Sequence, residues 1–382
     1  MRPLSRRAFL TTCSRAGLGV ATLATLPRWA RAGLGATAPH GVIVRNEWPE
    51  HWETEVGTLA RNWITANPTF FVRSHLDAPS IDPGTWRLEV TGLVDHPLTL
   101  SLDLVRALPH VERVHTLECA GNGRGLLHPA STSGTQWERG AVGNARWGGV
   151  TLATLLERAG VAGGARHVWF EAADRAPLAK VPPFLRSIPI EKAKADTFLA
   201  WTMNGAPLPR LHGAPLRAIV PGWYGMASTK WVTRIRLEEQ PSDNHFMVRG
   251  YRYNAPGEDP TKAEPVEAMR VKSLITYPLE GARIRPGAIT VQGFAWAGLP
   301  GVQRVELSID GGRSWQAAGF AGDSEPLAWR RWTVEVMLAH GARTLMARAT
   351  DAAGATQPLE ATLNAGGYGN NSIHQVNVDV AD

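Results

Sequence analysis

The strongest constraint on the fold is a strict alternation of apolar and polar residues in the last third of the chain. Apolar side chains occupy every second position in three stretches, namely Val305, Leu307 and Ile309, then Trp332, Val334 and Val336, then Leu345, Ala347 and Ala349. This period of two is typical of strands with one buried face. Short strands joined by turns such as Asp310-Gly311-Gly312 commonly build sandwiches of two sheets. We therefore predict an antiparallel β-sandwich over residues 271–382.

The preceding part of the chain, residues 40–255, has a different pattern. TWRLEVTGLV (85–94) and PLRAIVPG (215–222) are typical of strands, whereas LSLDLVRAL (100–108) and TLATLLERAG (151–160) have helical spacing. The order is neither a regular alternation of strands and helices nor a bundle, so we predict an α+β domain. Between the two parts, residues 256–270 are rich in proline and charge, as linkers often are.

The N-terminal residues 1–32 have the features of an export signal, in the expected order. A basic start with Arg6 and Arg7 precedes an apolar stretch from Ala16 to Leu26, and Ala30-Arg31-Ala32 fits a signal peptidase site. The apolar stretch is too short for a membrane span. We expect a twin-arginine signal peptide, cleavage after Ala32 and a periplasmic product without a membrane span. This route carries folded proteins and suits one that receives its cofactor in the cytoplasm.

The basic charge of the whole chain comes from this leader. The chain has 40 Lys and Arg against 34 Asp and Glu, and the leader's six arginines account for the excess. The expected mature protein is formally neutral, so the high pI is no argument for a nucleic-acid partner. The sequence contains no lysine-rich run, zinc finger or RNP-like motif. We predict that the protein does not bind nucleic acid.

The segment HTLECAGNGRG (115–125) contains Cys119, and the only other cysteine, Cys13, lies in the leader. Composition alone favours a buried, inert thiol. A nucleophilic cysteine needs a histidine base, for which His115 and His128 are available, but no protease signature surrounds them. A disulfide oxidoreductase needs a second cysteine, and zinc needs several Cys or His ligands at short spacing. One thiolate holds a soft metal only if other ligands come from outside the protein, for example from a dithiolene cofactor.

HTLECAGNGR resembles the molybdenum-binding segment of the sulfite oxidase family. Further segments resemble the family in the expected order: FFVRSHL (70–76), NGAPLPRLHGAPLRAIVPGWYGMASTKWV (204–232) and HFMVRGYRY (245–253). The C-terminal part resembles the family's immunoglobulin-like dimerisation domain. The resemblance implies a molybdenum-molybdopterin cofactor, with Cys119 as the protein's metal ligand, and a homodimer.

The resemblance also implies a pocket for an oxyanion. Its cationic lining would be Arg73, Arg124 and Arg330, with Arg331 as the neighbour that a shift of one residue would place there. Trp137 and Tyr251 would be its aromatic members. Arginine keeps its charge and offers forked donors that match the oxygens of sulfite or sulfate, and a phenol adds one directional hydrogen bond.

The same comparison assigns the residues that would bind the cofactor. They are Phe71, Arg73, His75, Cys119, Asp174, His212, Arg217 and Lys230, and of these Arg217 and Lys230 would meet the phosphate. The chain departs from the family's animal members in two places. Gly123 stands where those members have a second arginine, and the lysine expected shortly before Trp137 is missing from STSGTQW. Both departures lower the positive charge near the entrance.

The resemblance implies oxygen-atom transfer that converts sulfite to sulfate. Because the sequence has no CxxCH haem motif, electrons would pass to a separate acceptor, for which a c-type cytochrome is the first candidate. Two alternatives within molybdopterin chemistry are reduction of methionine sulfoxide in proteins and reduction of nitrate. A non-enzymatic β-rich binding protein with an inert cysteine is the alternative from another class.

Overall fold

The computed structural model describes residues 38–127, 132–175 and 181–382, and residues 39–382 form one compact unit. The expected signal peptide, residues 1–32, and its cleavage site lie outside the described residues. Within the described ranges, no helix is both long enough and apolar enough to cross a membrane.

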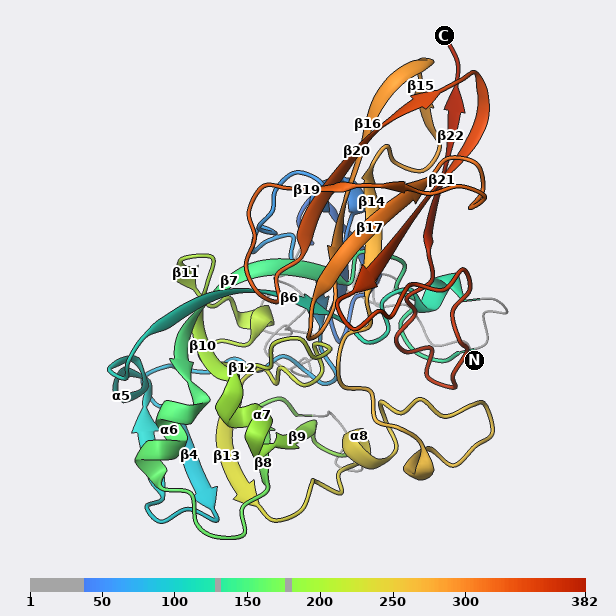
Figure 1. Ribbon diagram of the computed structural model, residues 1–382. Helices are drawn as coiled ribbons and strands as arrows, with labels where there is room; N and C mark the ends of the chain where they lie inside the picture. The colour runs from blue at the N-terminus through green and yellow to red at the C-terminus, as the bar shows by residue number, and fades with distance from the viewer. Residues whose placement is uncertain (1–37, 128–131, 176–180) are drawn as a thin grey trace, which may run out of the picture. The chain divides into compact units, whose positions relative to one another are not determined.

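The first part of the unit is built on two five-stranded sheets (Figure 1). One sheet has the order β5-β4-β13-β8-β9, and only its β4–β13 pair is parallel. Its strands are β4 (Arg87–Gly92), β5 (Leu98–Ser101), β8 (His167–Ala172), β9 (Leu185–Pro189) and β13 (Val232–Glu238). The other has the order β11-β10-β7-β6, with β12 also paired to β10. Its strands are β6 (Val111–Glu118), β7 (Val142–Thr151), β10 (Phe198–Met203), β11 (Ala206–Pro207) and β12 (Arg217–Ile219).

Short helices and a small sheet complete this part. The small sheet pairs β1 (Val42–Asn46), β2 (His51–Thr54) and β3 (Val72–Arg73). The α-helices are α4 (Val56–Leu59), α5 (Leu102–Arg106), α6 (Leu152–Ala159), α7 (Ile190–Ala195) and α8 (His245–Val248). The 3-10 turns are η1 (Arg124–Leu126), η2 (Arg210–His212) and η3 (Pro260–Lys262). The mixture confirms the predicted α+β class.

Helix α6 shows why its sequence predicted a helix. Thr151 caps its N-terminus by accepting a hydrogen bond from the Thr154 amide, and Gly160 ends it with a φ of +66°. Its apolar residues at helical spacing are buried in the core between the sheets and helices, namely Leu152, Leu155, Leu156 and Ala159.

The segment LSLDLVRAL is only partly helical. Its first residues belong to β5, and the helix starts at Leu102 because the Ser101 hydroxyl accepts from the Leu104 amide and caps it. The prediction of a helix from residue 100 was wrong for this first turn. The apolar spacing suited both structures, because Leu100 and Leu102 are both buried.

The predicted antiparallel β-sandwich is confirmed in the C-terminal part. One sheet has the order β14-β16-β20-β19 and the other β15-β22-β21-β17-β18, with β15–β22 as the one parallel pair among these described strands. The strands are β14 (Lys272–Tyr277), β15 (Ala282–Ile284), β16 (Gly287–Trp296), β17 (Val302–Ser308), β18 (Gln316–Ala317), β19 (Gly319–Ala321), β20 (Arg330–Leu338), β21 (Gly341–Asp351) and β22 (His374–Val380). The alternating residues seen in the sequence face the core between these sheets, as Val305, Trp332 and Ala347 do.

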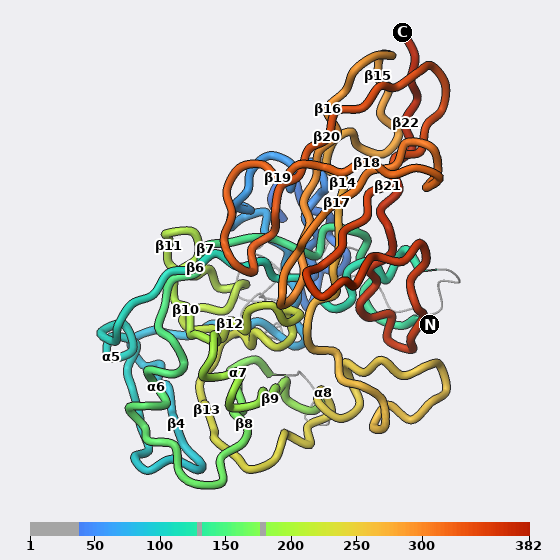
Figure 2. The backbone as a smooth tube through the Cα atoms, in the orientation of Figure 1, coloured from blue at the N-terminus to red at the C-terminus, as the bar shows by residue number. Residues whose placement is uncertain are grey.

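Residues 256–270, which we expected to be a linker, are mostly exposed as far as residue 264, and their last residues pack against the protein. Figure 2 shows this backbone passing from α8 to β14. Isolated bridges pair Pro265 with Arg252 and Ala268 with Trp223, and the side chains of Val266 and Met269 are buried. The connection therefore joins the two parts through a shared core.

Candidate active site: a cavity at the end of strand β6

The predicted cofactor residues gather around one cavity. It holds about 700 Å³ of space between atoms, including open solvent at its mouth. All eight of them line it, together with Tyr251: Phe71, Arg73, His75, Cys119, Asp174, His212, Arg217 and Lys230. Elements far apart in the sequence supply these residues, because β3, η2, β12, the loops after β6 and β8, the loop between β12 and β13 and the segment after α8 converge here.

Cys119 reaches the cavity because of its place after β6. Leu117 and Cys119 line the cavity, whereas Thr116 and Glu118 alternate with them and do not. The Cys119 amide donates to the Ala141 carbonyl at 2.9 Å, and its carbonyl accepts from the Asn122 amide at 2.8 Å. Burial raises the pKa of the Cys119 thiol, and the charges of Arg73 and Arg124 act in the opposite direction. A cation bound beside the sulfur would therefore favour the thiolate.

Arg73 brings a fixed positive charge into the cavity. Its Nη1 donates to the Ser74 carbonyl and lies 3.2 Å from His51 Nε2. The other ring nitrogen of His51 is 2.7 Å from the Thr135 hydroxyl. Burial lowers the pKa of His51 to about 3, and the neighbouring Arg73 charge contributes, so this imidazole is neutral near pH 7. His51 Nε2 also lies 2.9 Å from the Ser74 carbonyl, and the neutral ring adds no second positive charge beside Arg73.

Tyr251 and His75 form the second polar group of the cavity. The Tyr251 hydroxyl is hydrogen-bonded to His75 Nε2, and the His75 ring stacks on Phe184 at 3.9 Å between centroids. Burial lowers the pKa of His75 and raises that of Tyr251. Both groups are therefore uncharged near neutral pH, which leaves a phenol proton available for a hydrogen bond. Tyr251 has a φ of +57°, an uncommon value for a residue with a side chain.

Lys230 and Arg217 concentrate donors in another part of the cavity lining. Lys230 Nζ donates to the Ser74 hydroxyl at 3.0 Å and to the Leu211 carbonyl at 2.9 Å. Arg217 donates to the carbonyls of His212 and Ser228 at 2.8 and 3.1 Å. Burial lowers the pKa of both cations, that of Arg217 to about 9. Arg217 is buried and Lys230 is partly buried, and the hydrogen-bond partners of both among the described residues are neutral. Desolvated cations without a counter-charge are costly, and an anion would offset that cost.

Family models match both parts of the chain. Residues 75–246 match the oxidoreductase molybdopterin binding domain, and residues 263–381 match the Mo-co oxidoreductase dimerisation domain. The sulfite oxidase of Arabidopsis thaliana is 31% identical over 359 residues, which cover 86% of this chain and 91% of that protein. The chain belongs to the sulfite oxidase family.

Human mitochondrial sulfite oxidase is 35% identical to this family member over 359 residues, covering 88% of the chain. The chain spans 66% of that human protein, slightly less than two thirds of its length. Among solved structures, the sulfane dehydrogenase SoxCD from Paracoccus pantotrophus has a TM-score of 0.79 at 27% identity, covering 95% of this chain and 99% of that one. These matches confirm three predictions, namely the family, the fold class and the molybdenum-molybdopterin cofactor.

The residues around the cavity fit the family's cofactor. Arg217 Nε and Asp174 Oδ1 are buried and have no hydrogen-bond partner among the described residues. Burial raises the pKa of Asp174 to about 6 and lowers that of His212, whose Nε2 is 3.0 Å from the Asn67 carbonyl, to about 3. Within the described part of the chain, no three His, Cys, Asp or Glu residues are grouped so as to hold a metal. A metal at Cys119 would thus need ligands from a cofactor, and the pterin and phosphate would find unpaired polar atoms and cations.

Arg124 and Trp137, both predicted substrate residues of the family, lie beside the cavity but do not line it. Arg124 donates from Nε to the Gly366 carbonyl at 2.8 Å and from Nη1 to the Thr135 carbonyl at 3.0 Å. Its charge still acts on the Cys119 thiol. Trp137 is fully buried, and its ring is tilted against His51 at 5.8 Å.

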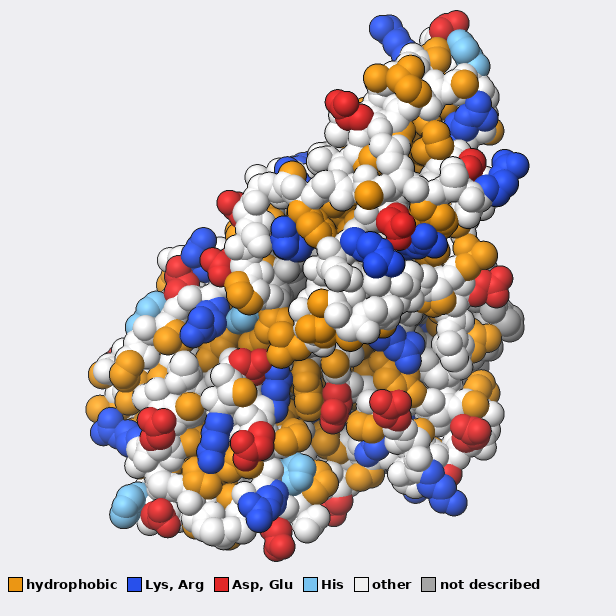
Figure 3. All heavy atoms as spheres, in the orientation of Figure 1, with side chains coloured by type: hydrophobic (Ala, Val, Ile, Leu, Met, Phe, Trp, Pro, Cys, Tyr) orange, Lys and Arg blue, Asp and Glu red, His pale blue; other side chains and the backbone are white. Residues whose placement is uncertain are grey.

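Arg330, the third predicted arginine, lies on the sandwich. Its guanidinium is stacked over Phe320 at 4.3 Å, and that of its neighbour Arg331 is over Phe294 at 5.3 Å. Neither residue lines the cavity. In Figure 3, basic and acidic side chains are mixed over the visible face. Among the cavity-lining side chains, the positive charge therefore comes from Arg73, Arg217 and Lys230.

His51 and Ser74, which contact Arg73 and Lys230, were not among the predicted site residues. Ser74 lies between two predicted residues in FFVRSHL, so its proximity to them was a usable signal. His51 lies in a segment without any motif, and only the pairing of β2 with β3, which sets His51 opposite Arg73, brings it to the site.

Proposed function

We propose that this protein oxidises sulfite to sulfate at a molybdenum-molybdopterin centre. The observation that carries the proposal is the arrangement of the Cys119 thiol, the Arg73 guanidinium and the protonated Tyr251 phenol on a single cavity in a member of the sulfite oxidase family. Thiolate sulfur suits a soft metal, and a guanidinium beside a phenol suits a small oxyanion.

The residues divide into a part for the cofactor and a part for the substrate. Cys119 binds molybdenum, Lys230 and Arg217 meet the phosphate, and His212 and Asp174 bind the pterin. When bound, the group supplies oxygen-atom transfer and takes up the electron pair that sulfite loses. The protein contributes position, charge and exclusion of water.

Arg73 and Tyr251 act on the anion. The Arg73 charge attracts sulfite, and its forked donors orient the sulfite oxygens. If neutral His75 carries its proton on Nε2, it donates to the phenol oxygen of Tyr251 and leaves the phenol proton free for the substrate. The low pKa of His75 keeps a second full positive charge away from that bond.

The acceptor, the assembly and the location are parts of the same proposal. Electrons pass to a separate acceptor, for which a c-type cytochrome is the first candidate. The chain forms a homodimer through the domain matched at residues 263–381. It reaches the periplasm by the twin-arginine route through residues 1–32. Cell fractionation of the wild type and of a variant with Arg6 and Arg7 changed to Lys tests the location, and periplasmic recovery of both would contradict that route.

The function is tested by sulfite-dependent reduction of cytochrome c, with molybdenum quantified in the same samples. The wild type is expected to contain molybdenum and to reduce cytochrome c, whereas Cys119→Ser is expected to lose both properties. Loaded wild type that ignores sulfite but reduces methionine sulfoxide, or oxidises a sulfane sulfur, would replace the proposed substrate. Wild type expressed with molybdate but free of molybdenum and pterin would favour the non-enzymatic alternative.

A further inference from the structure

Strand β6 separates the cavity from the sandwich. Its residues Leu117 and the following Cys119 face the cavity, and the alternate residues Thr116 and Glu118 are bonded to the C-terminal part. The Thr116 hydroxyl accepts from the Trp329 amide at 2.7 Å, and the Thr116 amide donates to the Leu327 carbonyl at 3.1 Å. The segment that presents the thiol is thus fixed from behind by the other domain.

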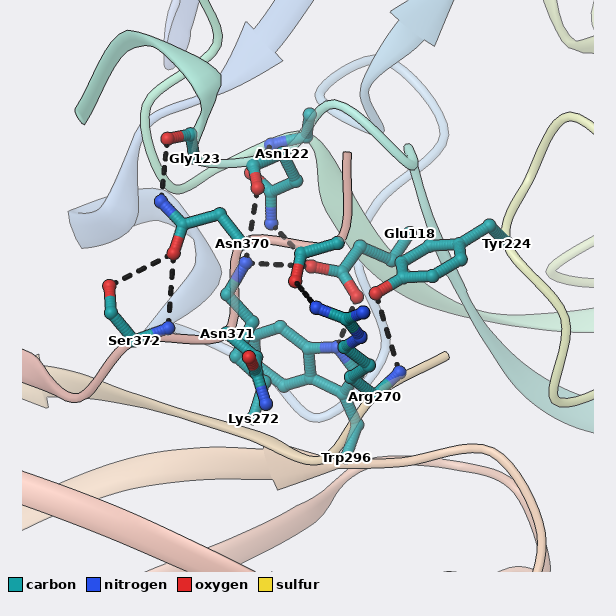
Figure 4. A network of polar contacts seen from close by, with 12 residues as sticks. Glu118, Asn122, Gly123, Tyr224, Arg270, Lys272, Trp296, Asn370, Asn371 and Ser372 are labelled. Atoms are coloured by element: carbon teal, nitrogen blue, oxygen red, sulfur yellow. Dashed lines mark hydrogen bonds and ion pairs between the residues drawn. The ribbon is translucent and has the colours of Figure 1, made fainter. Parts of the chain in front are cut away.

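Glu118 is the centre of this contact (Figure 4). Lys272 Nζ donates to Glu118 Oε1 at 2.9 Å, and Trp296 Nε1 donates to Oε2 at 2.9 Å. Lys272 is the first residue of β14 and Trp296 the last of β16, and the strand register sets them opposite each other. The side chains of Glu118 and Lys272 are 1% and 8% exposed. A cross-strand pair of the sandwich therefore holds both oxygens of the residue before Cys119.

The loop after Cys119 is held by the same domain. The Gly369 amide donates to the Ala120 carbonyl at 2.8 Å, and Asn370 Nδ2 donates to the Gly123 carbonyl at 2.8 Å. Lys272 Nζ also donates to the Asn122 carbonyl at 3.2 Å. The thiol therefore sits on a segment restrained on both sides by groups outside the molybdopterin-binding domain.

We propose that Lys272 and Trp296 are positioning residues for Cys119, which they orient through Glu118. The sandwich is then part of the metal site, in addition to any role in dimerisation. A buried ion pair is weak evidence for stability, because desolvation of its charges offsets most of their attraction. Its directional hydrogen bonds do fix the Glu118 side chain, and the Glu118 carbonyl is fixed from the opposite side by the Gly225 amide at 2.7 Å. The peptide that leads into Cys119 consequently has little freedom.

The inference rests on the proposed role of Cys119 as metal ligand, and thiol reactivity tests it without the metal. Full-length protein produced without molybdate is treated with iodoacetamide under native conditions, and peptide mapping by mass spectrometry follows Cys119 separately from Cys13. Lys272→Met removes the cation, and Trp296→Phe removes the indole donor together with part of a buried ring. Arg348→Met is the control within the same domain, because it breaks the 3.0 Å pair of Arg348 with Glu306, whose side chains are 30% and 19% exposed.

Both site variants are expected to raise the alkylation rate of Cys119 at least about tenfold, because loss of the restraint on Glu118 lets the partly exposed thiol move further into the cavity. Protein produced with molybdate should hold less molybdenum and give an altered Mo(V) paramagnetic resonance signal. The control should lower the thermal midpoint and leave alkylation unchanged. Unchanged alkylation in both site variants, or an equal rise in the control, would overturn the inference while sulfite oxidation by the wild type stands. A wild type without molybdenum would overturn the proposed function and, with it, the metal-directed part of this inference, although alkylation would still report on the thiol.

Discussion

Asp174 allows a quantitative test of the site, because its ionisation should destabilise the protein when no cofactor is bound. Its side chain is 3% exposed, and one carboxyl oxygen has no partner among the described residues. Burial raises its pKa from 3.8 to about 6, and the nearby Lys230 charge only partly offsets the shift. The folded state thus holds this proton more tightly than the unfolded state does.

The sign and size of the effect follow from proton linkage. Below pH 3.8 the carboxyl is neutral in both states, and the stability linked to its raised pKa is fully present. As the pH rises through about 6, that stability is lost, because the unfolded state releases its proton first. A shift from 3.8 to about 6 corresponds to about 3 kcal/mol. Little discount for solvent screening applies, since the group is almost fully buried.

Asp174→Asn removes this titration. The free energy of unfolding of the variant, minus that of the wild type, should rise with pH by up to about 3 kcal/mol between pH 4 and pH 7. Urea unfolding of protein produced without molybdate, at several pH values, measures the difference. The difference cancels contributions from groups that do not interact with Asp174, whereas Lys230, which does interact with it, still contributes. Asp103→Asn is the control, because the Asp103 side chain is 95% exposed. A difference for Asp174→Asn that stays constant with pH would refute the reasoning.

Two further substitutions probe the cavity and the sheet behind it. Tyr251→Phe removes the hydrogen bond with His75 and should lower kcat/KM for sulfite about tenfold with molybdenum retained. Steady-state kinetics with metal analysis checks this expectation. Loss of the metal would contradict a role of Tyr251 in substrate binding. Gly149→Ala should cost more than about 3 kcal/mol or prevent folding, because a Cβ there would lie 1.8 Å from the Leu199 carbonyl oxygen across the β7–β10 pair. Thermal unfolding beside Gly163→Ala, where a Cβ would meet nothing within 4 Å, checks it, and equal midpoints would contradict the packing argument.

Some of the fold could be predicted from the sequence because the signal was local. The sandwich followed from alternation at Val305, Leu307 and their counterparts, since one face of each strand must be buried. Helix α6 followed from its spacing and its threonine cap. The start of α5 was missed because a helix and a strand both bury Leu100 and Leu102, and only the Ser101 cap separates the two.

The site itself depended on the resemblance, and the resemblance could not show how its members are held. Cys119, Arg73 and Tyr251 were predicted as neighbours, yet His51, which contacts Arg73, reaches it through the pairing of two short strands that no motif marks. Arg124 and Arg330, by contrast, were predicted to line the cavity and do not line it. Each carries the charge that an oxyanion pocket needs, but carbonyls hold Arg124 and a phenyl ring covers Arg330. Charge can be read from a sequence, whereas the direction of a guanidinium depends on every group around it.

The contacts of Glu118 are the feature of the site that the sequence predicts least. Glu118 precedes Cys119 in the motif, but its role cannot be predicted until its ion-pair partner is known. That partner, Lys272, lies 154 residues further along the chain. A buried carboxylate without a cation would be costly enough to displace the segment that carries it. The cation can therefore come only from a group that the fold brings behind β6, and here that group begins the first strand of the sandwich. The residue at position 118 in the first domain and the residue at position 272 in the sandwich must therefore suit each other. If Lys272 positions Cys119 through Glu118 as proposed, a change at Lys272 will alter the surroundings of the thiol, although no motif joins Lys272 to HTLECAGNGRG.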